Sequence, residues 1–159
     1  TRWLLYCEGR SAFAFEPAMT AEGTDLYSVT KEIHFCYGHR LLHHRGKCRH
    51  LHGHNARAVI RLESESLDPL GMVVDFSDIG EYVKAWLKAK IDHNMLLCRE
   101  DPALPLLEGA GERVYVTEEN PTAEHIARLI YEYVEKGGYP VVEVAIYETE
   151  SAFASYRKR

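Results

Sequence analysis

The sequence lacks the features that mark several large classes of protein. Its four cysteines, Cys7, Cys36, Cys48 and Cys98, include no CxxC pair, so their spacing does not indicate a zinc knuckle or a disulfide framework, and we expect reduced thiols. No apolar run approaches the roughly 18 residues of a membrane span. The net charge of -5 argues against a nucleic-acid surface, which usually shows a basic excess. We therefore expect a cytoplasmic protein that binds neither membranes nor nucleic acids.

Internal repeats, low-complexity tracts and a glycine-rich phosphate loop are also absent. The length of 159 residues is that of one domain, which can bury a core without disulfides. A composition of 46% hydrophobic and 27% charged residues is typical of a soluble globular protein. We predict an irregular extension over residues 1–26, with one strand at most, and a single domain over residues 27–159.

The hydrophobic pattern predicts two strands, two helices and two further strands. Apolar residues alternate over 27–38 and again after His52, as in half-buried strands. Helical spacing follows over 76–91, with Asp75 as a candidate cap.

A loop rich in proline and glycine over 98–111 leads to the second helix, which Asn120-Pro121-Thr122 opens and Gly137-Gly138 ends. Residues 141–147 and 152–156 form the last strands. This order predicts an α+β domain in which both helices pack on one face of an antiparallel sheet.

Seven of the nine histidines lie within residues 34–54. His52 and His54 are two apart on a predicted strand, so their side chains share one face and can bind one ion. Hairpin pairing would bring His39, at the end of the preceding strand, beside them. A catalytic zinc takes three protein ligands and leaves one position open, and these three histidines are the candidates. A solvated loop is the simpler interpretation of the other loop histidines, which are His43, His44 and His50.

Other reactive groups lie near this motif or at the ends of elements. Cys48 has the cationic neighbours Lys47 and Arg49, and a nearby metal would favour its thiolate. Cys36 and Cys98 lack such neighbours, so we expect them to be structural.

Asp92-His93 follows the first helix and can form a proton-transfer unit, although such a pair at a helix end also arises by chance. Glu148 ends a strand, where a carboxylate is usually solvated but can also accept paired N–H bonds from a guanidine-like ring edge.

Several motifs together, in one order, resemble those of the 6-pyruvoyltetrahydropterin synthase and 6-carboxytetrahydropterin synthase family over residues 29–156. The motifs are Phe35-Cys36-Tyr37-Gly38-His39-Arg40-Leu41, Cys48-x-x-x-His52-Gly53-His54-Asn55, Val74-Asp75-Phe76, Asp92-His93, Asn120-Pro121-Thr122-Ala123-Glu124 and Tyr147-Glu148-Thr149. The resemblance implies a tunnelling fold (T-fold) that assembles into a homohexamer with active sites between subunits. It also implies 7,8-dihydroneopterin triphosphate as the substrate.

The resemblance further implies a role for each matching residue. His39, His52 and His54 match the zinc ligands, and Cys48 matches the base that removes a side-chain proton. Asp92 and His93 match the proton relay. Glu148 matches the pterin anchor, which is sometimes counted in the relay, and Thr122 matches a residue that lines the pterin pocket.

The three residues between Cys48 and His52 make the chain similar to the bacterial 6-carboxytetrahydropterin synthases of queuosine and 7-deazapurine biosynthesis. These lyases form 6-carboxy-5,6,7,8-tetrahydropterin and release triphosphate and acetaldehyde. A 6-pyruvoyltetrahydropterin synthase, which eliminates triphosphate, is the alternative. Two other classes stay open: a structural zinc module, which would bind Cys48 to the metal, and a pterin-binding or epimerase-like relative that needs no metal.

Overall fold

The computed structural model describes residues 25–159, so most of the predicted extension over 1–26 lies outside the described residues. The strands are β1 (Tyr27–His39), β2 (His52–Ser64), β3 (Met95–Cys98), β4 (Val114–Thr117), β5 (Val141–Tyr147) and β6 (Phe153–Tyr156). The helices are the short 3-10 helix η1 (Lys47–Arg49), α1 (Phe76–Lys90), α2 (Leu104–Gly109) and α3 (Ala123–Lys136).

β1 and β2 form a long antiparallel hairpin, as the alternating pattern predicts. Its register pairs His39 with His52 and Tyr37 with His54. Side chains of paired residues in an antiparallel ladder project to the same face. The hairpin therefore brings His39 beside the His-Gly-His motif.

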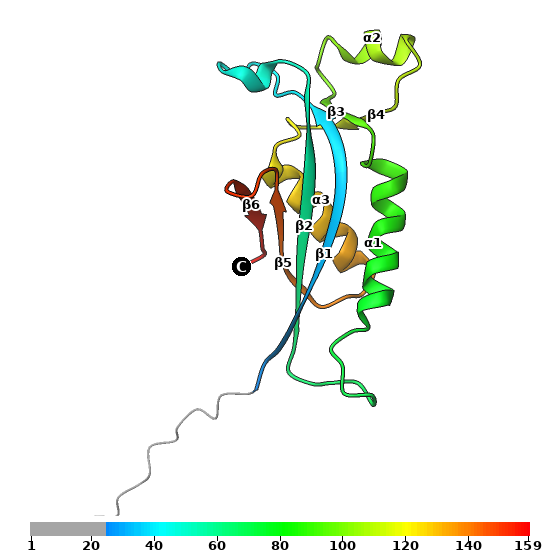
Figure 1. Cartoon of the computed structure of the whole chain (residues 1–159), viewed down its shortest axis with the longest axis vertical. Helices are drawn as coiled ribbons and strands as arrows, with labels where there is room; N and C mark the ends of the chain where they lie inside the picture. The colour runs from blue at the N-terminus through cyan, green and yellow to red at the C-terminus, as the bar shows by residue number, and fades with distance from the viewer. Residues whose placement is uncertain (1–24) are drawn as a thin grey trace, which may run out of the picture.

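The six strands form one sheet in the order β4-β3-β1-β2-β5-β6 (Figure 1). The four strands that the sequence predicts, β1, β2, β5 and β6, pair antiparallel. β3 and β4 extend the sheet with parallel pairing and were not expected. The prediction of a loop over 98–111 is also wrong in part, because α2 lies within it. Pro105 stands in the first turn of α2, where proline costs no hydrogen bond.

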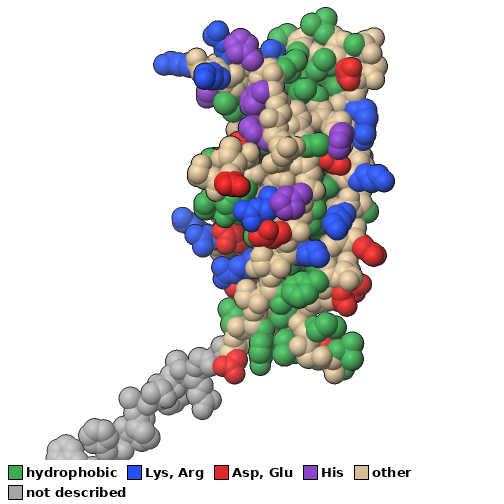
Figure 2. Space-filling view, in the orientation of Figure 1, with side chains coloured by type: hydrophobic (Ala, Val, Ile, Leu, Met, Phe, Trp, Pro, Cys, Tyr) green, Lys and Arg blue, Asp and Glu red, His purple; other side chains and the backbone are tan. Residues whose placement is uncertain are grey.

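The core lies between one face of the sheet and the helices α1 and α3. Alternate side chains of β1, such as Ile33 and Phe35, pack there with Ile79 of α1 and Ile130 of α3. Both helices therefore cover the same face, as predicted. The opposite face is polar, and Figure 2 shows charged side chains of both signs across the strands. There Arg57 Nη1 donates to Glu32 Oε1 at 2.8 Å.

The predicted helix ends are present. The side chain of Asp75 accepts from the backbone N–H of Ser77 at 2.6 Å and caps α1. Thr122 caps α3 in the same way by accepting from the N–H of His125, and Gly137 ends that helix. No helix in residues 25–159 is long and apolar enough to cross a bilayer.

Candidate functional site

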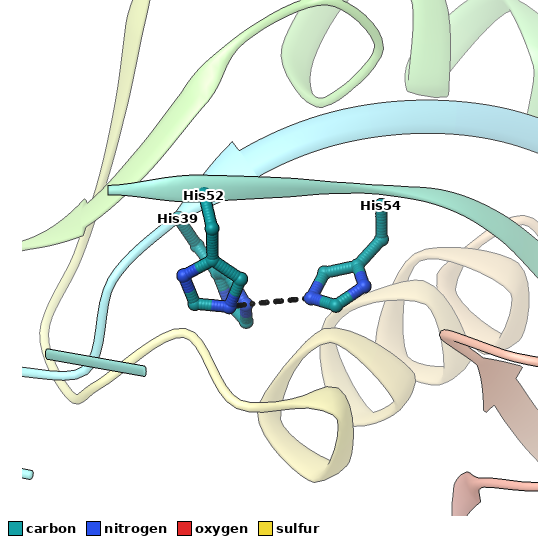
Figure 3. Close-up of side chains that lie close together, drawn as sticks. All are labelled: His39, His52 and His54. Carbon is teal, nitrogen blue, oxygen red and sulfur yellow. Dashed lines mark hydrogen bonds between the residues drawn. The ribbon is translucent and has the colours of Figure 1, made fainter. Parts of the chain in front are cut away.

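Three histidines converge at the end of the β1–β2 hairpin, on the face that the helices cover. His39 Nε2 lies 3.0 Å from His52 Nε2 and 3.2 Å from His54 Nε2. Figure 3 shows the three rings turned toward a common point below the strands. The ring nitrogens lie close enough together to hold one metal ion.

Hydrogen bonds on the far side of two rings fix their orientation. His39 Nδ1 lies 2.8 Å from the carbonyl oxygen of Pro121, and His52 Nδ1 lies 2.7 Å from that of His50. A carbonyl only accepts, so each Nδ1 carries a proton and donates it. In neutral rings both Nε2 atoms then hold lone pairs, and no proton bridges the 3.0 Å between them. Two lone pairs this close repel each other unless a cation lies between them. The donors therefore fit a metal such as zinc.

The electrostatic environment of His39 suits a ligand as well. Its side chain is only 3% exposed, and this burial lowers its pKa more than the Pro121 and Glu148 oxygens raise it. The neighbouring imidazoles lower the pKa further. His39 is therefore neutral near pH 7, which is the form that binds a metal.

A cavity of about 340 Å³ opens beside the three histidines. Its lining includes His39, Cys48, His54, Thr122 and Glu148, all of which the sequence analysis singles out. These residues come from β1, η1, β2, the start of α3 and the end of β5. The fold therefore gathers two of the three predicted ligands, the predicted base and the predicted anchor around one space.

Glu148 faces the histidines across this cavity. Its Oε1 lies 3.9 Å from the Nε2 atoms of His39 and His54. Tyr37 donates its hydroxyl to the same oxygen at 2.7 Å. Burial raises the pKa of Tyr37, and the carboxylate raises it further, so the phenol stays protonated. The second carboxylate oxygen has no partner among the described hydrogen bonds of Glu148 and can accept one from a ligand.

Cys48 lies in η1, in the loop that joins β1 to β2. Its thiol is free, and its carbonyl accepts from the N–H of Leu41 at 2.8 Å. His43, His44 and His50 of the same loop are exposed, which confirms the expectation that they are solvated.

Asp92 and His93 do not reach the histidine site within one chain. They lie next to β1, where His93 donates its backbone N–H to the carbonyl of Cys36 at 2.8 Å. Side chains alternate along a strand, so Cys36 points to the opposite face from Tyr37 and His39. Cys36 Sγ lies 3.6 Å from Asp92 Oδ1. Cys36 was expected to be structural, and the structure adds that its thiol contacts Asp92 and His93.

Sequence reasoning also missed two contacts that support the site. The first is the bond from Tyr37 to Glu148, which joins residues 111 positions apart. The second is the pair of Arg40 and Asp101, in which Nε donates to Oδ2 at 2.6 Å and Nη2 donates to Oδ1. Burial by itself would raise the pKa of Asp101, but the guanidinium and the N–H of Ala103 lower it overall. This pair anchors the residue that follows His39.

Known proteins match the chain over nearly all of the described residues. A family model described as 6-pyruvoyl tetrahydropterin synthase matches residues 28–159. The 6-carboxy-5,6,7,8-tetrahydropterin synthase of Rickettsia typhi is 36% identical over 135 residues, which cover 80% of this chain and 98% of the relative. The protein of the same name from Synechocystis sp. is 33% identical and covers 82% of this chain and 93% of the relative.

Solved structures match the fold. An uncharacterized protein from Wolinella succinogenes superposes with a TM-score of 0.71 at 25% identity, covering 84% of this chain and 99% of the other. The 6-pyruvoyl tetrahydropterin synthase of Caenorhabditis elegans gives a TM-score of 0.63 at 21% identity, covering 86% of this chain and 98% of the other. The expected α+β class and T-fold are confirmed.

Proposed function

The chain belongs to the 6-pyruvoyl tetrahydropterin synthase family, and on this basis we propose that it is a zinc-dependent lyase acting on a reduced pterin. The proposed reaction converts 7,8-dihydroneopterin triphosphate and one molecule of water to 6-carboxy-5,6,7,8-tetrahydropterin, triphosphate and acetaldehyde. The relatives named above as 6-carboxy-5,6,7,8-tetrahydropterin synthases support this product. So does the spacing of three residues between Cys48 and His52. The proposed setting is queuosine or 7-deazapurine biosynthesis in the cytoplasm.

The observation that carries the proposal is the convergence of the three imidazoles beside Cys48 and Glu148. His39, His52 and His54 would hold zinc and leave a position open toward the cavity. Zinc in such a site supplies Lewis acidity, which acidifies a bound hydroxyl and the adjacent C–H. The backbone carbonyls of Pro121 and His50 keep the rings of His39 and His52 in the binding orientation.

The protein's own groups would bind the substrate and move its protons. The Cys48 thiolate takes a proton from the substrate side chain as general base. Glu148 accepts the ring N–H and exocyclic amine of the pterin with two nearly parallel bonds, while Tyr37 holds one of its oxygens in place. Thr122 borders the same cavity and lines the pterin pocket.

The proposed relay residues require a second copy of the chain. Asp92 and His93 lie on the face of β1 opposite the histidine site, so the pair that serves one cavity would come from another subunit. Asp92 Oδ1 lies 3.1 Å from His93 Nδ1 and can orient the imidazole for proton transfer. A homohexamer with active sites between subunits, as proposed for this chain, supplies this arrangement.

Incubation of the zinc-loaded protein with 7,8-dihydroneopterin triphosphate tests the proposal. We expect 6-carboxy-5,6,7,8-tetrahydropterin, triphosphate and acetaldehyde, identified by mass. Formation of 6-pyruvoyltetrahydropterin would instead establish the alternative activity, which the family description favours. An unconsumed substrate, with zinc bound in full, would contradict both and point to a pterin-binding relative.

A further inference from the structure

The side chain of Asn120 bonds to the backbone of Leu42, which is 78 positions away in the chain. The N–H of Leu42 donates to Asn120 Oδ1 at 2.7 Å, and Asn120 Nδ2 donates to the Leu42 carbonyl at 3.0 Å. β1 ends at His39, so Leu42 lies in the turn beyond it and its backbone groups have no partner in the sheet. The Asn120 amide therefore supplies the two bonds that a neighbouring strand would supply.

Both ends of this contact lie next to the histidine site. Pro121 follows Asn120 directly, and its carbonyl oxygen accepts from His39 Nδ1 at 2.8 Å. On the other side, Leu42 is three residues beyond His39 along the chain. The segment from His39 to Leu42, the Asn120 amide and the Pro121 carbonyl therefore form a closed ring that returns to His39. The segment that leads into α3, yellow in Figure 3, passes close to the histidine rings.

The chain around Pro121 is fixed from both directions. Thr122 donates its N–H to the carbonyl of Asn120 at 2.8 Å, which makes a tight turn at the buried Pro121. The Thr122 side chain also caps α3 by accepting from the N–H of His125. The helix therefore holds Pro121 from one side, and Asn120 holds it from the other.

The chemistry of an amide suits this position. An asparagine side chain offers one acceptor and one donor group side by side, which match the N–H and the carbonyl of a single residue. A carboxylate only accepts, so an aspartate here would keep the bond from the Leu42 N–H and set an oxygen against the Leu42 carbonyl. A serine has a single oxygen and cannot replace both bonds.

We propose that Asn120 is a positioning residue of the histidine metal site, acting through Pro121 and His39. It holds the Pro121 carbonyl where that oxygen keeps the proton on His39 Nδ1 and turns Nε2 toward the other two histidines. Groups that orient a metal-binding histidine in this way change metal affinity by about 10- to 100-fold. The inference rests on the metal site of the proposed function but not on its reaction.

The zinc Kd of the full chain, measured by competition with a chromophoric chelator, tests the proposal. We expect Asn120→Asp and Asn120→Ser to bind zinc about 10- to 100-fold more weakly than the unmodified protein. A new carboxylate by itself attracts a cation, so weaker binding by the aspartate variant cannot come from its charge. The serine variant is uncharged, and it keeps the test valid if the aspartate variant does not fold.

Tyr131→Phe is the matched control for a general loss of stability. It removes a buried hydrogen bond of the same kind, from the Tyr131 hydroxyl to the carbonyl of Val141 at 3.0 Å, between α3 and β5. Tyr131 does not line the cavity beside the histidines. The zinc Kd of this variant should therefore equal that of the unmodified protein.

Hydrogen exchange of the imidazole N–H groups, followed by NMR on the zinc-free chain, gives a second measurement. The Nδ1–H of His39 should exchange faster in the Asn120 variants. That of His52 donates to the carbonyl of His50 at 2.7 Å and should not change, because Asn120 does not hold that residue.

Several results would overturn the proposal. An unchanged zinc Kd in the Asn120 variants would do so, and so would an equal loss of affinity in Tyr131→Phe. Equally faster exchange at His39 and His52 would show that the site had loosened as a whole. If the unmodified protein bound no zinc, the proposed function would fail together with this inference, whereas failure of this inference alone leaves zinc binding by the unmodified protein intact.

Discussion

The two faces of strand β1 carry two clusters of polar side chains that differ in composition and in burial. On the helix-covered face, His39 meets two further imidazoles, and it is almost fully buried. On the polar face, Cys36 meets a carboxylate and an exposed imidazole. Side chains alternate between the two faces along a strand, so Cys36 and His39, three residues apart, lie on opposite faces. The buried set of like donors therefore suits a tightly bound ion, whereas the groups of the mixed set already contact one another.

Replacing both members of the His-Gly-His pair should have the largest effect on metal binding. His52→Ala with His54→Ala removes two of three ligands, so we expect loss of the tightly bound zinc after purification. Metal analysis of the purified protein measures it. Cys36→Ser is the matched control and should retain one equivalent, because its thiol lies on the other face. Full zinc occupancy in the double variant would show that other residues bind the ion.

Removal of each thiol sharpens the functional difference between the faces. Cys48→Ala should keep zinc and lower turnover by at least about a hundredfold, which is the lower end of the range for loss of a general base. Cys36→Ala should lose less than about tenfold, because the bond that holds Asp92 comes from the backbone N–H of residue 36, which the substitution keeps. Steady-state rates on the pterin substrate compare the two. Equal turnover of Cys48→Ala and the unmodified protein would show that another group acts as base.

Glu148 tests whether the cavity on the helix-covered face recognises a pterin. Glu148→Gln keeps the shape of the side chain but sets an N–H against an N–H, and an unpaired buried group costs about 1 to 3 kcal/mol. Pterin affinity should fall about 5- to 150-fold at roughly 1.4 kcal/mol per tenfold, with zinc content unchanged. Calorimetry measures the affinity. The exposed Glu150→Gln makes the same chemical change nearby and should bind normally; equal binding by the Glu148 variant would place the anchor elsewhere.

The ion pair of Arg40 and Asp101 separates stability from metal binding. The folded-state pKa of Asp101 is lowered, so the pair stabilises the fold above the ordinary aspartate pKa of about 3.9 and this contribution is lost as pH falls through the lower, folded-state value. Asp101→Asn should reduce the free energy of unfolding by about 1 to 3 kcal/mol at neutral pH.

As the pH is lowered, the free energy of unfolding of the Asp101→Asn variant should approach that of the unmodified protein. The zinc content of the variant should not change. Denaturant unfolding at several pH values measures this. Glu118→Gln, in an exposed pair with Arg99, should have little effect. If the loss of unfolding free energy in Asp101→Asn does not depend on pH, the ionised Asp101 carboxylate does not stabilise the fold through Arg40.

The sequence was sufficient to predict those strands and helices in which apolar residues recur at a regular spacing. Alternation over β1 and β2 predicts their hairpin, and the hairpin register places His39 beside His52. The caps at Asp75 and Thr122 follow from local side-chain chemistry. These features depend on residues close in the chain or on one ladder, so their patterns are visible without the structure.

Short elements and distant contacts could not be predicted in the same way. β3 and β4 are four residues each, too short to show a period. Cys36 and Asp92 are 56 positions apart and meet only because the turn after α1 lies along β1. The face on which Asp92 and His93 lie also depends on this packing, and motif order alone did not indicate that they point away from the histidines.

X-ray absorption at the zinc edge tests whether the three histidines hold the tightly bound ion. On the purified protein carrying one equivalent of zinc, we predict a first shell of nitrogen and oxygen only, at about 2.0 to 2.1 Å, with the outer-shell pattern of three imidazoles. The spectrum should be unchanged in Cys48→Ser. A sulfur atom at about 2.3 Å in the spectrum of the one-equivalent protein would contradict the histidine site, because the tightly bound ion would then have a cysteine ligand.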